Sequence, residues 1–531
     1  MSLSPATRSP WAMRSRKLRR IQSRRDSGGD VGDAAIMQDS FDRPLTIPDG
    51  RWLTICHLLI YIRRPGPRGP WKGGAMELTK PATPSARTDG GQGVPGRVTT
   101  AAVLGTVLEW YDFAIYASMA AVIGRLFFPS DDPTVSLLVT FASYAIGFVC
   151  RPLGAIVLGR LGDRAGRRSM LAITMVTVGV ASVLIGLLPT HASAGMLAPT
   201  LLVALRMVQG LAAGAEWTGG ATFLIEYART GRRGLYSGVV QASTVAGFLL
   251  GTGVAVVVVR LVPEAAVDSW GWRVPFLLGG IVAAVGLFVR LKLDESPAYR
   301  ELHAPQKPIR RQGAEADDST PGDSDNSSAD EDNGSGAVTE TRRSWLLVLG
   351  IVFGVTLYGY TATSFPAFLD AVGALSLGDA LTTNAIALLI EVPLIIAAGA
   401  LSDRVGRKKV MGGALALYAL ATYPVFLLAT NGTLAGALAG QVIFVVLFAA
   451  VSGPMAALFV ELFPTRVRST AFSSSYNIGA AIFGGTAPFV NMLLATKTGV
   501  SVAPAFYLVC GALVSLAFLS RVRDRYQEEL R

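Results

Sequence analysis

Long apolar blocks of about twenty residues dominate the chain from residue 98 to residue 521. A block of this length spans the ~30 Å hydrocarbon core of a bilayer as a helix. Apolar and polar residues do not alternate with a period of two, which would mark a membrane β-barrel. Because lipid admits only helices or closed barrels, the pattern predicts an all-α membrane protein. The twelve predicted transmembrane helices lie near 98–126, 134–158, 169–189, 197–226, 234–259, 273–291, 344–369, 380–400, 410–429, 433–461, 469–494 and 502–521.

A polar stretch interrupts this series after the sixth block. Residues 292–343 include a run rich in Asp, Ser, Gly and Asn, a composition that cannot bury enough apolar surface to fold. The stretch predicts an acidic, flexible linker between a six-helix half over 98–291 and a second half over 344–521. A basic leader, 1–97, precedes the two halves, and a short tail, 522–531, follows them.

Lysine and arginine gather in the loops after blocks two, four, eight and ten, whereas the opposite loops hold few cations. By the positive-inside rule, the cation-rich loops face the cytoplasm. Both termini and the linker are therefore predicted to be cytoplasmic.

The two halves repeat the same motifs. The segment Gly159–Arg168 (GRLGDRAGRR) matches Gly399–Lys408 (GALSDRVGRK), 240 positions later. A segment that begins at Glu226 has its counterpart at Glu461, 235 positions later. Two motifs at nearly the same offset indicate a duplicated six-helix unit with pseudo-symmetric halves.

With these motifs the chain resembles the major facilitator superfamily, whose hallmark is the Gly-x-Leu-x-Asp-Arg-x-Gly-Arg-Arg loop. Within it, the chain is similar to the metabolite:H+ symporter family, which includes transporters of proline/betaine, α-ketoglutarate, citrate and shikimate. The residues that carry this closer likeness are Leu108–Phe113, Phe127–Pro129, Arg151–Gly154, Gly271–Phe276, Tyr476–Gly479 and Gly484–Pro488. The resemblance implies a secondary active transporter in the cell membrane of a prokaryote. It would import a small organic acid or similar metabolite with protons, by alternating access.

Other classes of function fit the sequence less well. An osmolyte (proline/betaine) symporter is the second candidate. An efflux antiporter would carry a Gly-Pro-rich motif in helix five, but 234–259 contains no proline. A transporter-like receptor would bind its ligand without flux. An enzyme is not expected, because His57, His191 and His303 do not cluster and no nucleophile or phosphate-binding motif occurs.

The charge distribution bears on the expected partners. Residues 1–75 hold fourteen Lys and Arg against six Asp, so they carry +8 of the net charge of +11. A basic field is therefore not a property of the transporter body, and no nucleic-acid partner is expected. The expected partners are a small substrate, the proton and the bilayer. The proton gradient is the driving force, no cofactor is expected, and the protein is expected to act as a monomer.

The charged leader also raises the question of where translation starts. We expect the native protein to start at Met76, because the codons of Lys72–Gly74 form a purine-rich run that suits a ribosome-binding site. The apolar run Trp52–Ile62 is too short to span a bilayer. The alternative is a basic arm that binds anionic lipid.

Charged residues inside apolar blocks are the functional candidates, because a charge in lipid is unfavourable. Glu109 and Asp112 share one face of helix one near the membrane midplane. Two close carboxylates repel each other, so we expect one of them to bind and release a proton near neutral pH. The alternative is a structural pair that is hydrogen-bonded to neighbouring helices. Arg206 and Glu216 of helix four are further candidates for proton coupling, through an ion pair that exchanges partners.

Arg151 is the first candidate for substrate binding. Its planar fork either receives the carboxylate of a substrate or pairs with an acid of helix one or helix four. Polar side chains on the same face or on inner helices of the second half are further candidates: Tyr144, Tyr358, Tyr360, Tyr476 and Asn477. The lone acid Glu391 has no predicted role.

The repeated loops predict a cytoplasmic lock made of ion pairs. Asp163 and Asp403 are expected near the start of the following helix, where an anion is favoured. Pairs formed by the motif arginines would hold one conformation and break in the other, with Arg167 joining Asp163 or Glu226 and Arg407 joining Asp403 or Glu461. The alternative is that the cations only set the topology. The complete predicted set is Asp163, Arg164, Arg167, Glu226, Asp403, Arg404, Arg407 and Glu461.

Overall fold

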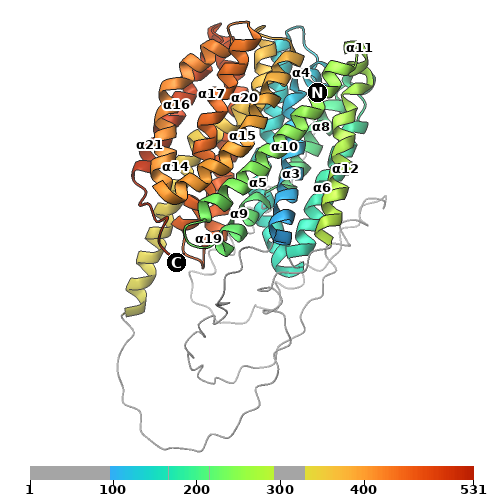
Figure 1. The fold of residues 1–531 in the computed structure, drawn as a ribbon. Helices are drawn as coiled ribbons and strands as arrows, with labels where there is room; N and C mark the ends of the chain where they lie inside the picture. Colours follow the sequence, from blue (N-terminus) through green and yellow to red (C-terminus); the bar gives the residue numbers. More distant parts are fainter. Residues whose placement is uncertain (1–95, 166, 215, 292–328, 531) are drawn as a thin grey trace, which may run out of the picture. The chain divides into compact units, whose positions relative to one another are not determined.

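The computed structural model of the chain describes residues 96–165, 167–214, 216–291 and 329–530. All of them belong to one compact unit, which extends over residues 89–531. Within these ranges the chain is helical, with no strand (Figure 1). The predicted all-α architecture is thereby confirmed for the described residues. The prediction about Met76 lies outside them, as do most of the predicted leader and linker.

The helices before the linker form a first set, which contains several short pieces between the long helices (Figure 1). They are α3 (Gly96–Ser118), α4 (Ala120–Phe127), α5 (Pro133–Ala165), α6 (Arg167–Leu187), α7 (His191–Ala194), α8 (Leu197–Ala212), α9 (Glu216–Tyr227), α10 (Arg233–Leu261), α11 (Glu264–Ala266), the π-helical turn η1 (Val267–Gly271) and α12 (Arg273–Leu291).

The helices after the linker form a second set. They are α14 (Ala329–Ala371), α15 (Leu377–Val405), α16 (Arg407–Ala429), α17 (Leu434–Ser452), α18 (Met455–Leu462), α19 (Arg468–Gly479), the π-helical turn η2 (Ala480–Gly484), α20 (Ala487–Thr498) and α21 (Pro504–Ser520).

Some predicted boundaries differ from the observed ones. Helix α14 begins at Ala329, fifteen residues before the predicted boundary at 344, so the last part of the predicted linker is helical. An apolar helix can propagate into a polar segment once it is nucleated, and acidic residues are favoured in its first turns. The predicted helix 433–461 is broken between α17 and α18, where Pro454 follows Gly453. Proline lacks the N–H group that a continuous helix would use.

Eight described helical segments are long and apolar enough to cross a membrane. The segment Glu264–Gly271 and the following Arg273–Phe288 meet at a bend of 46°, and counting this pair as one span gives nine. Two shorter apolar helices, Ala172–Leu187 and Pro504–Ser520, accompany them.

Glycines bring pairs of helices into close contact. On α8, a Cβ atom at Gly210 would overlap the carbonyl oxygen of Gly147, and just after α8 a Cβ atom at Gly214 would overlap that of Arg151. Both carbonyl groups belong to α5. Helix α10 meets α15 in the same way, at Gly234 and Gly399. The spacing Gly210-x-x-x-Gly214 is typical of helices that approach each other closely.

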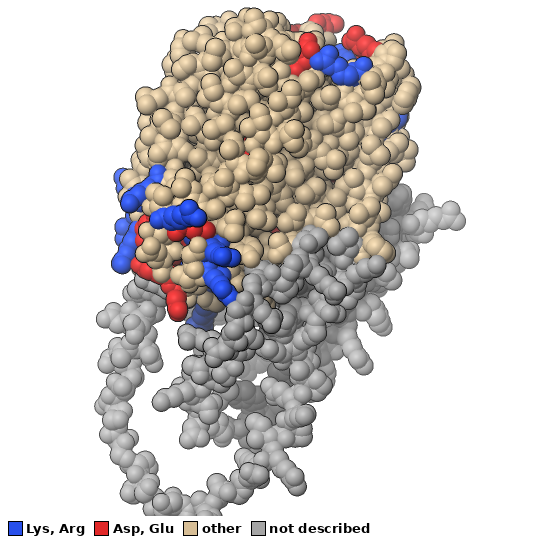
Figure 2. Space-filling view, viewed as in Figure 1, with Lys and Arg blue, Asp and Glu red and all other residues tan. Residues whose placement is uncertain are grey.

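Charged side chains gather at the two ends of the bundle on the face seen in Figure 2, and the surface between them is almost free of charge. This is the distribution of a protein whose sides contact lipid. We call the end at which α9 finishes and α19 starts the lower end, and the opposite end, with α4 and α11, the upper end (Figure 1).

Candidate functional site

A buried ion pair joins α3 and α5 in the interior of the first set of helices. Arg151 donates from NH2 to Glu109 Oε1, and both side chains are at most 3% exposed. Removing either partner would leave an uncompensated buried charge, which is strongly destabilising. The sequence left open whether Arg151 binds a substrate carboxylate or pairs with an acid of helix one or helix four. In the structure it pairs with an acid of helix one.

Aromatic rings surround this arginine. The guanidinium carbon of Arg151 lies 4.9 Å from the ring centroids of Trp110 and Phe113 and 5.1 Å from that of Phe148. At this range the face of each ring attracts a cation. The ring of Tyr360, on α14, meets Phe148 edge-on at 4.7 Å, so the enclosure includes the second set of helices.

A second aromatic contact crosses between the two sets. Trp217 of α9 stacks on Tyr476 of α19 at 4.4 Å between centroids, and both rings are buried. We call the rings of Trp110, Phe113, Phe148, Trp217, Tyr360 and Tyr476 the aromatic enclosure. Three of its polar atoms have no hydrogen-bond partner in the described structure, although they are buried: Trp110 Nε1, Trp217 Nε1 and the Tyr360 hydroxyl. Such N–H and O–H groups can form hydrogen bonds with a polar ligand that enters the enclosure.

Asp112 has its own partners, distinct from those of Glu109. Its Oδ1 accepts from Ser182 Oγ, and its Oδ2 accepts from Gln209 Nε2. Gln209 Oε1 in turn accepts from Arg206 NH1 at 2.8 Å. The two acids of helix one therefore belong to separate networks, with Gln209 linking Asp112 to Arg206.

Arg206 is 1% exposed. Its guanidinium carbon lies 4.2 Å from the ring centroid of Tyr116 and 5.6 Å from that of Tyr144. Its Nε and NH2 atoms lack hydrogen-bond partners among the described residues. Glu216, the other predicted coupling residue of this segment, is partly exposed and lines a small cavity of about 20 Å³ together with Glu109.

Three predicted substrate residues of the second set occupy different surroundings. Tyr360 and Tyr476 belong to the aromatic enclosure. Tyr358 does not, because its ring stacks on Tyr418 at 3.6 Å and its hydroxyl bonds to Thr422 at 2.9 Å. Helical periodicity explains the difference, since residues two apart on a helix point to different sides. The packing around Tyr358 belongs to the second set alone and does not support substrate contact.

Asn477 is the remaining candidate of this group. Its Nδ2 donates to the carbonyl oxygen of Gly214 at 2.9 Å, so it joins α19 to the end of α8. It also donates to the carbonyl oxygen of Ser473 at 2.9 Å. Asn477 therefore holds the two sets together beside the enclosure.

The second copy of the repeated motif closes the lower end. The Asp403 carboxylate accepts from the backbone N–H groups of Gly234 and Leu235, each at 2.8 Å, and from Arg407 NH1 at 2.8 Å. An anion is favoured at the exposed N–H groups of a helix start. That start belongs to α10 and not to the following helix, α16, so Asp403 bridges the two sets.

The remaining lock residues extend this bridge. Arg407 NH2 bonds to Glu461 Oε1 at 3.1 Å, and Arg233 lies 3.7 Å from the same oxygen. The structure thus brings Arg407 to both of its predicted partners. Arg404 is exposed.

Glu226 has a partner that the sequence did not suggest. Its Oε1 accepts from Arg468 NH1 at 2.7 Å. This pair links α9 to α19 and forms a second bridge at the lower end. The side chains of Asp163, Arg164 and Arg167 lie outside the described part of the chain.

Glu391 is 1% exposed within α15, and its Oε1 has no hydrogen-bond partner among the described residues. It is separate from the networks of Glu109 and Asp112. The sequence places this acid in an apolar segment without a predicted role, and the structure shows that its side chain is buried.

Comparison with known proteins identifies the architecture. Residues 98–523 match the model of the family described as "Sugar (and other) transporter". The chain belongs to this family. It is therefore a member of the major facilitator superfamily and a multi-pass secondary transporter of the cell membrane.

Two relatives carry substrate names. A glycine betaine/proline/ectoine/pipecolic acid transporter of Dickeya dadantii is 34% identical over 425 residues, which are 79% of this chain and 81% of the relative. A proline/betaine transporter of Salmonella typhimurium is 33% identical over 429 residues, 79% of this chain and 82% of the relative. The crystal structure of a D-xylose–proton symporter has the same fold, with a TM-score of 0.63 at 18% identity, over 82% of this chain and 99% of that one.

Proposed function

We propose that this transporter imports a zwitterionic osmolyte of the betaine or proline type together with protons. The substrate names of its relatives support this class over the small organic acid that the sequence favoured. The observation that carries the proposal is the Arg151–Glu109 pair inside the aromatic enclosure. Such a site offers a fork for a carboxylate and ring faces for an ammonium group.

The carboxylate and the ammonium group of a zwitterion would bind to different parts of the site, the guanidinium of Arg151 and the aromatic rings. The substrate carboxylate competes with Glu109 for the guanidinium of Arg151. A quaternary or secondary ammonium group is attracted by the faces of Trp110, Trp217 and Tyr476. Since these rings come from α3, α9 and α19, a bound substrate contacts both sets of helices and favours their approach.

Proton coupling follows from the same competition. A carboxylate that loses its cation to the substrate becomes an uncompensated buried charge, and taking up a proton relieves it. In this scheme Glu109 binds the proton when the substrate takes Arg151. Asp112 responds through Gln209 and Arg206, which share its hydrogen-bond network.

We also propose that twelve helices cross the membrane in two six-helix halves, with both termini in the cytoplasm. The eight spans, the bent pair, the two shorter apolar helices and α3 with α4 offer twelve crossings. The charged loops of the lower end support its cytoplasmic side by the positive-inside rule. The monomeric state and the absence of a cofactor stay predictions.

Uptake into proteoliposomes tests this function. Radiolabelled glycine betaine and proline should accumulate when an inward proton gradient is imposed and should only equilibrate without one. Shikimate and α-ketoglutarate are the comparison substrates. Accumulation of these acids without betaine or proline would support the organic-acid candidate, which rests on Arg151, and would contradict the osmolyte proposal.

A further inference from the structure

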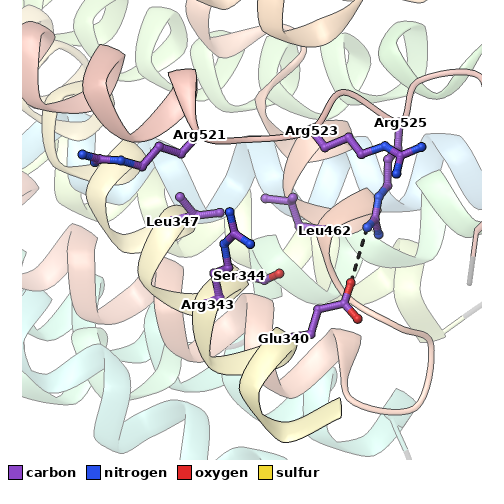
Figure 3. A pocket seen from close by; sticks show the side chains of 8 residues that line it. All are labelled: Glu340, Arg343, Ser344, Leu347, Leu462, Arg521, Arg523 and Arg525. Carbon is purple, nitrogen blue, oxygen red and sulfur yellow. Dashed lines mark hydrogen bonds and ion pairs between the residues drawn. The ribbon is translucent and has the colours of Figure 1, made fainter. Parts of the chain in front are cut away.

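A pocket of about 290 Å³ opens at the lower end, between α14 and the segment that follows α21 (Figure 3). Four arginines line it: Arg343 on α14, and Arg521, Arg523 and Arg525 after the last helix. Among the described residues that line it, Glu340 is the single acid. The pocket is therefore strongly cationic, and it is separate from the aromatic enclosure.

The ion pairs between these arginines and other described residues are long. Arg525 NH2 lies 3.4 Å from Glu340 Oε1, the pair drawn in Figure 3, and its Nε lies 3.7 Å from Glu528 Oε2. Arg523 lies 3.4 Å from the same Glu528, with 76% of its side chain exposed. Charge-assisted pairs with good geometry are near 2.7–2.9 Å. The donors are therefore available to a better acceptor.

One part of the pocket wall is apolar. Leu347 of α14 and Leu462 of α18 line the pocket and are buried. The neighbouring Leu346 is 46% exposed on the side of α14. Both helices that frame the pocket change from apolar to charged sequence here, α14 at Arg343 and α21 at Arg521. This boundary is where the hydrocarbon core of a bilayer gives way to headgroups.

Hydrogen bonds hold the segment that carries three of the arginines. Lys408 Nζ donates to the carbonyl oxygens of Ser520 and Val522, at 2.6 and 2.9 Å. Asp524 accepts from the backbone N–H of Lys408 at 2.9 Å, and the Glu528 carbonyl accepts from Arg233 at 2.7 Å. The arginines are thus positioned before any ligand arrives, which reduces the entropy lost on binding.

We infer that this pocket binds the phosphate headgroup of an anionic phospholipid. The planar guanidinium fork matches phosphate oxygens, and several arginines around one cavity favour a headgroup of net negative charge over a zwitterionic one, whose ammonium group they repel. Basic pockets between membrane helices are known as lipid headgroup sites. The leucine wall and the boundary position favour a lipid over free phosphate, because the acyl chain can leave along the apolar side of α14. The inference does not depend on which substrate is transported.

Native mass spectrometry of the full-length protein tests this inference. Detergent-purified protein is mixed with phosphatidylglycerol, or with phosphatidylcholine that has the same acyl chains. We expect phosphatidylglycerol to be retained at least about tenfold more tightly. The triple variant Arg343→Gln/Arg521→Gln/Arg525→Gln should lose this preference. The single variant Arg343→Gln, at an exposed position, should lose part of it even if the triple variant fails to fold.

A control with the same change of charge separates this pocket from general surface attraction. Arg229, Lys409 and Arg466 are exposed and do not line the pocket, and replacing all three by Gln should leave phosphatidylglycerol binding within about twofold. Equal losses in the control and the pocket variants would overturn the inference. If inorganic phosphate alone raised the melting temperature as much as phosphatidylglycerol does, the ligand would be the ion, and the lipid assignment would be wrong.

Discussion

Arg151 is held by one carboxylate and three aromatic faces at once, and these contacts use different properties of the side chain. The ion pair needs only a positive charge, whereas stacking needs the flat guanidinium. Lysine would keep the charge but lose the fork and most of the contact with the rings.

We therefore predict that Arg151→Lys lowers substrate affinity by about tenfold or more, the loss of roughly 1.4 kcal/mol that one bidentate contact can supply. The measurement is the concentration dependence of betaine and proline uptake into proteoliposomes. Arg466→Lys, an exposed substitution on the same protein, should transport normally. Unchanged uptake by Arg151→Lys would remove this arginine from the substrate site.

Glu109 and Asp112 lie three residues apart yet belong to different hydrogen-bond networks. We predict that Glu109→Gln and Asp112→Asn each abolish gradient-driven accumulation and spare part of the substrate exchange, because an amide keeps the shape but cannot release a proton. Counterflow and pH-jump uptake in the same vesicles separate the two activities. Glu264→Gln, at an exposed position, is the control. Accumulation at the level of the unmodified protein in both variants would place the proton elsewhere.

Two buried acids of the second set make a contrasting pair. Glu461 faces Arg407, whereas Glu391 Oε1 has no partner in the described structure. Glu461→Leu should lower stability by about 1–3 kcal/mol, because the buried guanidinium of Arg407 loses one of its two carboxylate partners and keeps only Asp403. Glu391→Leu should leave stability unchanged or raise it by up to about 1 kcal/mol, because it removes an unsatisfied polar group. Thermal unfolding in detergent measures both. If Glu391→Leu folds but loses transport, that acid has a functional role.

At the scale of elements, the lower-end lock depends on where helices start and stop. The N–H groups that Asp403 binds are free only because α10 begins at Arg233, and Gly234 and Gly399 let the two backbones approach. We predict that Asp403→Asn weakens this bridge and raises the population open at the lower end. Asparagine keeps the shape but has no full charge for the helix start or for Arg407.

A reporter cysteine measures this change. Ser473 of α19 faces α9, where its Oγ is 3.1 Å from Thr218 Oγ1, so Ser473→Cys should be alkylated faster when the lower end opens. In a background without the native cysteines, Asp403→Asn should raise the labelling rate about tenfold, equivalent to roughly 1.4 kcal/mol. Arg404→Gln, at an exposed position of the same motif, is the control. An equal labelling rate in all three proteins would favour a purely topological role for the motif.

The sequence alone predicted elements better than contacts. Apolar length located the helices, since crossing a bilayer fixes that length. It does not indicate the break at Pro454, where the N–H group is missing, or the start of α14 within a polar segment. Their position inside apolar blocks made Arg151 and Glu109 candidates, because charges are rare in membrane helices. Their partnership, the pair between Glu226 and Arg468, and the place of Trp217 against Tyr476 all depend on how distant helices meet, which periodicity does not encode.

For the whole molecule, α10 and α15 are the main contact between the two sets, and they are joined at both ends. At the lower end, Asp403 binds the start of α10 beside the buried pair of Arg407 and Glu461. At the upper end, Arg260 pairs with Asp379 at 2.5 Å, with side chains 44% and 37% exposed. Alternating access requires these two connections to break in turn. The upper one is weaker, because an exposed pair contributes only about 0.2–1 kcal/mol.

This difference in exposure makes the balance between the two open states sensitive to ionic strength. Dissolved salt weakens interactions between exposed charges, with a screening length that falls from about 10 Å at 0.1 M to about 3 Å at 1 M, and it has much less effect on buried pairs. A more concentrated medium therefore weakens the Arg260–Asp379 pair while the pair of Arg407 and Glu461 persists, which favours opening at the upper end. A cysteine label at that end should react up to severalfold faster in high salt, and this dependence should disappear in Asp379→Asn. A transporter with this asymmetry would respond to the salinity of its surroundings through the contacts of its own helices.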